Sequence, residues 1–219
     1  MKTIALIHTV KPVLNQFSEL LKSTIDEELI TYDLYDDFLA IDPTNLGYFS
    51  KNNKRRLYND VENCSITGAD MIVVTCSTLT PIVTEIRPFF NVPIIAIDDA
   101  MCEEAISSGN KIRVLATAKS TIQPTVSKLK EEALKQGKKI EIVSSDLPVA
   151  YEAMKKGDLK LHDELLLDVI KDITNFDVIV LAQASMAHLA DKGTQLSGLK
   201  VLGSVNSCIN NIAKILKEN

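Results

Sequence analysis

Short apolar runs alternate along this chain with segments in which apolar residues recur at helical spacing. Residues 71–75, M-I-V-V-T, form the clearest run, which is typical of a strand buried on both faces of a parallel sheet. Residues 13–25 show the other pattern, because Val13, Phe17 and Leu21 share one face of a helix. The alternation predicts an α/β fold in which helices cover mainly parallel strands.

The same two patterns extend over the whole chain. Strands are predicted at residues 4–9, 29–34, 71–75, 93–97, 112–116, 140–143, 178–182 and 201–202. Helices are predicted at residues 13–25, 53–66, 80–90, 100–107, 122–136, 149–156, 164–173, 186–191 and 205–217. Residues 36–50 lack a clear period and contain Pro43 and Gly47, so we expect a long loop there. Loops of that length are often functional, and Tyr48 is either a lid residue or a packed anchor of this loop.

The two halves of the chain resemble each other. Residues 70–74 superpose on residues 177–181 with a shift of 107 positions (177 − 70), and the same shift places residues 93–96 over 200–203. The first strands of the halves, which begin at Ile4 and Ile112, match with a shift one or two larger. A fixed shift over two strands indicates a duplicated unit.

The duplication predicts two pseudo-symmetric, Rossmann-like lobes. We expect the first lobe at residues 1–98 plus 205–219 and the second at residues 99–204, with the active site in the cleft between them. The shift of 107 makes Gln183 the counterpart of Cys76, so these side chains are predicted to approach the site from opposite lobes.

Cys76 is the candidate reactive group. It ends a buried strand and precedes Ser77 and Thr78, after which Pro81 indicates the first turn of a helix. Open α/β sheets bind ligands at such strand ends, and a thiol at a helix N-terminus loses its proton more easily than elsewhere. The alternative is that Cys76 is a small buried apolar residue.

Composition narrows the classes of function. The chain has 219 residues, of which 46% are hydrophobic and 24% charged, which is ordinary for a soluble globular protein. A net charge of −5, with no basic run longer than residues 54–56, argues against nucleic-acid binding.

The sequence also bears on the location of the protein. No apolar run reaches membrane-spanning length, and no signal peptide is recognised. Four cysteines without a C-x-x-C pair, and three histidines without ligand spacing, predict a cytoplasmic protein with free thiols and no metal site.

Three motifs carry a resemblance to a known family. They are V-V-T-C-S-T around Cys76, V-L-A-T-A-K-S-T at residues 114–121 and V-L-A-Q-A-S-M-A at residues 180–187. In this order, over nearly the full length, the chain resembles the aspartate/glutamate/hydantoin racemase superfamily of cofactor-independent racemases. The resemblance implies an isomerase that needs no cofactor and acts on a small carboxylate or amino acid. It is also compatible with a homo-oligomer.

The resemblance also implies roles for particular residues. In this family one cysteine thiolate removes the proton next to the substrate carboxylate, and a second cysteine returns a proton from the other face. Cys76 matches the first cysteine. The residues implied to bind the substrate are Thr9, Ser77, Thr78, Thr117, Ser120, Thr121, Gln183, Ala184 and Ser185.

The chain departs from the family pattern at the second cysteine. Gln183 stands there, and an amide does not titrate near neutral pH. His8, at the end of the first strand, is a candidate second acid or base, although it could instead bond a neighbouring loop. The remaining alternatives are a one-cysteine decarboxylase, isomerase or lyase, and a non-catalytic protein that binds small carboxylates. A Rossmann-type nucleotide binder is disfavoured, because no G-x-G-x-x-G follows either first strand.

Overall fold

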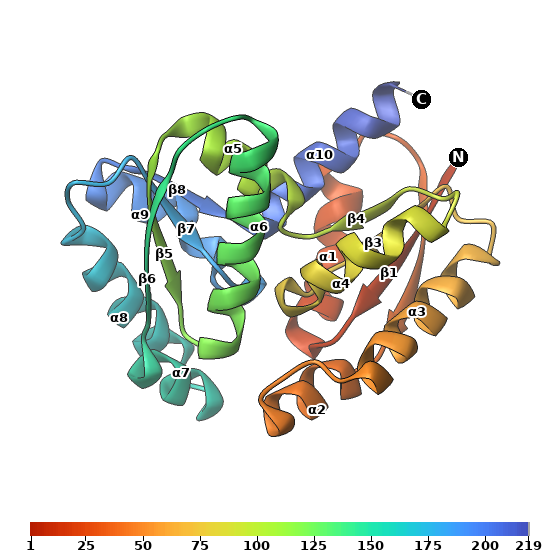
Figure 1. The fold of residues 1–219 in the computed structure, drawn as a ribbon, viewed down its shortest axis with the longest axis horizontal. Helices are drawn as coiled ribbons and strands as arrows, with labels where there is room; N and C mark the ends of the chain where they lie inside the picture. The colour runs from red at the N-terminus through yellow and green to blue at the C-terminus, as the bar shows by residue number, and fades with distance from the viewer. Residues whose placement is uncertain (219) are drawn as a thin grey trace. The chain divides into compact units, whose positions relative to one another are not determined.

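The computed structural model describes residues 1–218, which form two compact α/β units. Unit 1 comprises residues 1–97 and 208–218, and unit 2 comprises residues 98–207. Each unit is one parallel four-stranded sheet with helices packed against it (Figure 1). The predicted fold class, a pair of α/β lobes with mainly parallel sheets, is therefore confirmed.

The sheet of unit 1 has the strand order β2-β1-β3-β4. Its strands are β1 (Lys2–His8), β2 (Leu29–Tyr35), β3 (Met71–Val74) and β4 (Ile94–Ala96). Its helices are α1 (Lys11–Thr24), α2 (Phe38–Leu46), α3 (Lys51–Ser65) and α4 (Thr80–Ile86), with the 3-10 turns η1 (Ser77–Leu79) and η2 (Arg87–Phe89). Strand β3 is buried throughout, as its continuous apolar sequence predicts.

The sheet of unit 2 has the equivalent order β6-β5-β7-β8. Its strands are β5 (Lys111–Ala116), β6 (Glu141–Asp146), β7 (Val178–Leu181) and β8 (Lys200–Gly203). Its helices are α5 (Asp99–Ser108), α6 (Ile122–Lys135), α7 (Pro148–Lys155), α8 (Leu159–Lys171) and α9 (Ala190–Ser197), with the 3-10 segments η3 (Lys119–Thr121) and η4 (Ala184–Leu189). Helix α10 (Ser204–Glu218) begins in unit 2 and ends in unit 1. The identical strand order supports the duplication that the sequence indicates.

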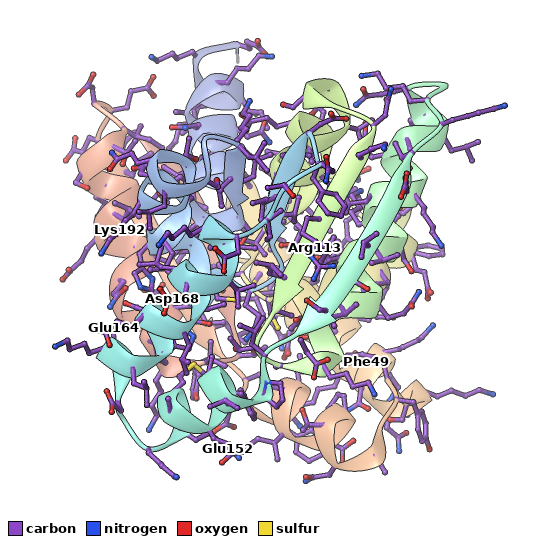
Figure 2. All side chains as sticks on the ribbon, turned by 90° about the vertical axis from the view of Figure 1, so that its left-hand side faces the viewer. Phe49, Arg113, Glu152, Glu164, Asp168 and Lys192 are labelled. Carbon is purple, nitrogen blue, oxygen red and sulfur yellow. The ribbon has the colours of Figure 1, made fainter. Side chains whose placement is uncertain are left out.

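Both faces of the unit 2 sheet are covered by helices. Val114 and Val180 pack with α5 and α6 on one face, whereas Leu115 and Leu181 pack with α7, α8 and α9 on the other (Figure 1). The outer side of α8 carries the exposed Glu164 and Asp168, which are labelled in Figure 2. The inner side of that helix carries leucine and isoleucine, as an amphipathic helix requires. Strands β5 and β7 are therefore packed between two apolar layers, one on each face of the sheet.

Three predictions of secondary structure differ from the structure. The helix predicted at 186–191 is the 3-10 segment η4 (Ala184–Leu189) followed by α9 (Ala190–Ser197). Residues 36–50 are not a long loop, because α2 covers most of them despite Pro43 inside the helix. Leu39 is the buried residue of α2, and Gly47 ends the helix in the left-handed conformation with φ of 76°. The apolar residues of α2 surround the helix instead of recurring on one side, which explains why no helical period is visible in its sequence.

The helix predicted at 164–173 begins earlier than expected. Its first residue is Leu159, because the side chain of Asp158 caps the helix by accepting a hydrogen bond from Leu161 N–H.

Within residues 1–218, no helix combines the length and apolar character that a membrane span requires.

Candidate functional site

The carboxyl edge of the unit 1 sheet brings Thr9 and Cys76 to the same level. Ile7 of β1 pairs with Val74 of β3 in the parallel ladder, and Thr9 and Cys76 each follow two residues later. Side chains alternate between the faces of a sheet, so residues two positions past a register pair continue on the face of that pair. The backbone therefore places Thr9 and Cys76 at the same edge and on the same face of the sheet, as a site at this edge requires. That this edge binds a substrate stays a prediction.

Cys76 is the reactive-group candidate that the structure leaves accessible. Its backbone is extended, with φ of −129° and ψ of 115°, and its carbonyl oxygen accepts a hydrogen bond of 3.0 Å from Leu79 N–H, which closes the turn η1. The Sγ atom lies 3.1 Å from Thr78 Oγ1. A hydroxyl at this distance can donate to a thiolate and so stabilise the charged form. The turn is a 3-10 turn followed by the short α4, so hydrogen bonding by Thr78, more than a helix dipole, is the local stabilising interaction.

The other three thiols are buried in the two units. Cys64, Cys102 and Cys208 are free and buried, whereas Cys76 is partly exposed. Burial, together with the charge of Asp60, raises the pKa of Cys64 to about 11. Burial also raises the pKa of Cys102 well above its ordinary value. These two groups are therefore neutral packing residues at physiological pH.

Thr9 presents an unsatisfied hydroxyl group at the edge of unit 1. Only 2% of Thr9 is exposed, and its Oγ1 atom has no hydrogen-bond partner among the described residues. A buried hydroxyl without a partner costs about 1–3 kcal/mol, so such groups in folded proteins call for a ligand, a water molecule or a functional reason. Thr9 therefore stays a predicted binding residue, with a buried hydroxyl that has no partner among the described residues.

His8 is fully buried on the other side of β1, with both ring nitrogens in hydrogen bonds. Nδ1 lies 2.8 Å from Thr75 Oγ1, and Nε2 lies 3.1 Å from Asp33 Oδ1. A carboxylate can only accept, so Nε2 carries a proton. The Thr75 hydroxyl lies 2.8 Å from Nδ1 and also 3.1 Å from Ile7 O, so its single proton has two acceptors within reach. Burial lowers the pKa of His8, while the hydrogen bond and charge of Asp33 partly oppose this shift. The ring also contacts Phe17 edge-on, with a centroid distance of 6.2 Å.

The equivalent edge of unit 2 holds Thr117 and Gln183. Leu115 of β5 pairs with Leu181 of β7, and Thr117 and Gln183 follow two residues later, as Thr9 and Cys76 do in unit 1. The side-chain oxygen of Gln183 accepts three hydrogen bonds, from Thr117 N–H at 2.6 Å, Thr117 Oγ1 at 3.0 Å and Ala118 N–H at 2.8 Å. Gln183 is only 9% exposed. The A-T-A segment after β5 is thus a cluster of donors that surrounds one acceptor.

The orientation of the Gln183 amide follows from its partners. Two of the three contacts are backbone N–H groups, which can only donate, so the atom among them is the oxygen. Ala118 was not among the predicted site residues, because its contribution is a backbone N–H that any residue could supply.

The other predicted site residues lie on the short turns that follow these strands. Ser77 is buried in η1, and Ala184 and Ser185 are half-buried in η4. Thr121 donates its hydroxyl to Ala118 O at 2.8 Å and so closes the loop after β5, whereas Ser120 is exposed on η3. Substrate contacts by these residues stay predictions.

A second polar cluster lies next to η4. Asp163 accepts from His162 Nδ1 at 2.7 Å and from His188 Nε2 at 2.9 Å, and thereby links α8 to the turn that follows Gln183. Although burial disfavours the charged form, the two histidines lower the pKa of Asp163 below its ordinary value. His162 is 1% exposed, because it lies on the inner side of the N-terminal turn of α8.

Among the described residues, no group of three or more His, Cys, Asp and Glu side chains is arranged to hold a metal ion. The polar groups on the two edges are a thiol with hydroxyl groups in unit 1 and an amide held by a donor loop in unit 2.

Comparison with known proteins places these features in a wider group. The model of the Asp/Glu/Hydantoin racemase family matches residues 11–212. An aspartate racemase homologue from Pyrococcus horikoshii OT3 is similar in structure, with 19% sequence identity, a TM-score of 0.74, and coverage of 99% of this chain and 100% of that chain. Picrophilus torridus aspartate racemase gives 18% identity, a TM-score of 0.72, and coverage of 99% and 95%. Allantoin racemase from Klebsiella pneumoniae gives 15% identity, a TM-score of 0.69, and coverage of 99% and 88%. At such identities the structural likeness concerns the fold.

Proposed function

This chain belongs to the Asp/Glu/hydantoin racemase family, and we propose that it transfers a proton at the carbon next to the carboxylate of a small acid or amino acid, with the Cys76 thiol as acid and base. No cofactor takes part in the proposed reaction. The observation that carries the proposal is the placement of Cys76, a partly exposed thiol level with the unpartnered hydroxyl of Thr9 at a sheet edge.

The proposed first step is removal of the α-proton by the Cys76 thiolate. The C–H bond breaks, an S–H bond forms, and the electron pair moves into the carboxylate to give an enediolate. Thr78 Oγ1 lies 3.1 Å from Sγ and can donate a hydrogen bond to the sulfur during this step. Thr9 Oγ1, which has no partner within the described chain, can donate to a carboxylate oxygen and stabilise the added charge. Return of the proton from the S–H group to the same carbon restores the thiolate.

Inversion at this carbon would need a second group that returns a proton from the other face. Gln183 cannot do so, because its amide does not titrate and its oxygen already accepts three hydrogen bonds. We assign His8 a positioning role, since its ring bonds Thr75, the residue before Cys76, and its other nitrogen bonds Asp33. The acid/base role predicted for His8 would require the ring to leave one of these partners.

The state of Gln183 favours a second candidate function, a one-cysteine decarboxylation. In that reaction the bond between the α-carbon and a carboxylate breaks, carbon dioxide leaves with no net redox change, and the resulting carbanion takes the proton of the Cys76 S–H group. A single acid suffices, so the loss of the second thiol does not prevent this chemistry.

The test is exchange of the α-proton in D₂O, followed by NMR for a panel of amino acids, malonates and other small carboxylates. We expect exchange or loss of carbon dioxide for at least one of them, and a fall of at least about 100-fold for Cys76→Ala, as removal of a general base usually gives. Cys64→Ala is the matched control, since that thiol is buried and neutral, and it should keep the activity.

Exchange that persists in Cys76→Ala would disprove the thiol mechanism. A wild-type protein that is stabilised by small carboxylates in thermal unfolding, yet turns over none of them, would instead show that the chain is a non-catalytic carboxylate-binding protein.

A further inference from the structure

Equivalent positions of the two units differ in how their donor groups are satisfied. In unit 1 the Thr9 hydroxyl is buried and has no partner among the described residues, and Cys76 bonds Thr78 instead. In unit 2 the equivalent hydroxyl, Thr117 Oγ1, donates to Gln183 Oε1. The sheets have the same strand order, so the duplicated fold provides an internal comparison between an unfilled edge and a filled one.

The filled edge has the geometry of a site for a carboxylate oxygen. Three donors of Thr117 and Ala118 meet one oxygen at 2.6–3.0 Å, which is the normal range for N–H and O–H hydrogen bonds. Each of these groups has a single proton, and each proton is directed to Gln183 Oε1. None of the three therefore remains for a ligand while the Gln183 side chain is in place.

We propose that Gln183 determines ligand specificity by closing the donor loop at Thr117 and Ala118 to small carboxylates. The amide oxygen takes the place that a ligand oxygen would take. The donor loop of unit 2 is then occupied by a group of the chain itself and is not a carboxylate site. This inference rests on the proposed function only in treating small carboxylates as the ligand class.

Displacement of Gln183 by a free carboxylate is unfavourable for two reasons. The amide is tethered, and tethered groups act at an effective concentration of about millimolar or above. Its displacement would also leave a primary amide that is now 9% exposed in need of new partners. A carboxylate does form stronger, charge-assisted bonds with N–H donors, which makes the loop a good anion site once Gln183 is removed.

The experiment uses the full chain labelled with ¹⁵N and follows the amide resonances of Thr117 and Ala118 during titration with acetate. The titration extends to about 50 mM, which covers the millimolar dissociation constants expected for a single small anion. In the wild type we expect these two resonances to stay in place. In Gln183→Ala we expect saturable shifts of both, with an affinity for acetate at least about tenfold above the wild-type value, equivalent to about 1.4 kcal/mol.

Two further variants separate a specific role of the amide from a general structural one. Gln183→Asn shortens the side chain by one methylene group, so that its oxygen no longer reaches the loop, and it should bind acetate as Gln183→Ala does. Gln183→Glu keeps an oxygen at the right length, so its loop should stay closed to acetate at neutral pH. If Gln183→Ala does not fold, Gln183→Asn provides the open loop.

The inference would be overturned if the amide resonances of Thr117 and Ala118 shifted with acetate in the wild type, and if the wild type bound acetate as tightly as Gln183→Ala does. A lack of acetate binding in both Gln183→Ala and Gln183→Asn would overturn it as well. Neither outcome depends on turnover, so the result is separate from the exchange assay with Cys76→Ala.

Discussion

Asp36 and Asp60 place two carboxyl groups together in unit 1, next to Arg56. Asp36 follows β2, is 6% exposed and forms an ion pair with Arg56 Nε. Asp60, on α3, is half-buried, and burial together with a hydrogen bond to Asp36 and its charge raises the pKa of Asp60 to about 7. When two carboxyl groups lie this close, the pair with one shared proton is more favourable than the pair with both groups ionised.

The raised pKa predicts that unit 1 loses stability as the pH increases. The folded protein keeps the Asp60 proton up to about pH 7, whereas the unfolded chain releases it near the ordinary value of 3.8. The folded state thus binds more protons between these pH values, so the free energy of unfolding falls from pH 4 to pH 7. Asp60→Asn should remove this slope and stabilise the protein at pH 8 by about 1–2 kcal/mol, a range reduced for solvent screening.

Urea unfolding at pH 5 and pH 8 measures this effect. Asp26→Asn, at an exposed position of unit 1, is the control and should leave the difference between the two pH values unchanged. A wild-type protein that is equally stable at both pH values, or an Asp60→Asn variant with the wild-type slope, would contradict the prediction.

The hydrogen bonds of His8 lead to a kinetic prediction. His8→Gln keeps a donor that can reach Asp33 but removes the titrating ring, so a positioning role predicts slower exchange, by about tenfold, with the same pH profile. An acid/base role predicts instead that one limb of the pH profile disappears. The pH dependence of kcat/KM for α-proton exchange distinguishes these roles, and a lost limb would restore His8 as the second base.

At the scale of elements, the packing of β8 against η4 fixes the turn that follows Gln183. A Cβ atom on Gly203 would lie 2.8 Å from Ala187 Cα and 3.0 Å from Ala187 Cβ, closer than real side chains approach. Because one of these neighbours is backbone, Gly203→Ala must displace η4, which should lower the free energy of unfolding by about 1–3 kcal/mol. Chemical denaturation measures this change.

Gly193→Ala is the matched control for Gly203→Ala. Its added Cβ would meet only side-chain atoms of Ile170 and Val201, at 3.3–3.4 Å, and alanine favours the helix α9. We expect a change within about 0.5 kcal/mol of the wild type, the usual range for tolerated substitutions. Equal destabilisation by both substitutions would mean that the close approach of Gly203 to Ala187 is not the cause of the destabilisation.

The same scale shows where sequence patterns succeed and where they fail. Short continuous apolar runs predicted the strands correctly, because strands buried on both faces of a parallel sheet are composed almost entirely of apolar residues. They missed α2, since Pro43 and Gly47 resemble loop residues although Gly47 is the C-cap of a helix. Leu39 alone is buried in α2, and a single buried residue leaves no periodic signal.

At the scale of the whole molecule, the duplication was the most informative feature of the sequence. It related Cys76 to Gln183, and the register of each sheet now supports that equivalence. The sequence could not reveal that Gln183 fills the donor loop, because the partners are backbone N–H groups without a residue signature. It also left the orientation of His8 open, since a strand-end histidine can face either side of a sheet.

The duplication extends to the amino ends of the strands, where both units use an aspartate in the same way. Asp70 Oδ2 accepts from Thr3 N–H at 2.8 Å, and Asp177 Oδ2 accepts from Lys111 N–H at 2.8 Å and from Asn110 N–H at 2.7 Å. These backbone hydrogen bonds lower the pKa of both carboxyl groups. Each aspartate therefore ties the start of its own strand to the first strand of the same unit, β1 or β5.

The repeated contact predicts unit-specific effects of two equivalent substitutions. A lowered folded-state pKa adds stability above the unfolded value of 3.8, which is lost as the pH falls through the folded value. At pH 7, Asp70→Asn should reduce amide hydrogen-exchange protection in β1 and β3, and Asp177→Asn in β5 and β7, with Asp26→Asn and Asp168→Asn as exposed controls. As the pH falls below 3.8 both differences from the wild type should shrink, because the carboxyl groups of the native protein then become protonated at their lowered pKa values. Loss of protection in both units from either single substitution would show that the units do not open independently.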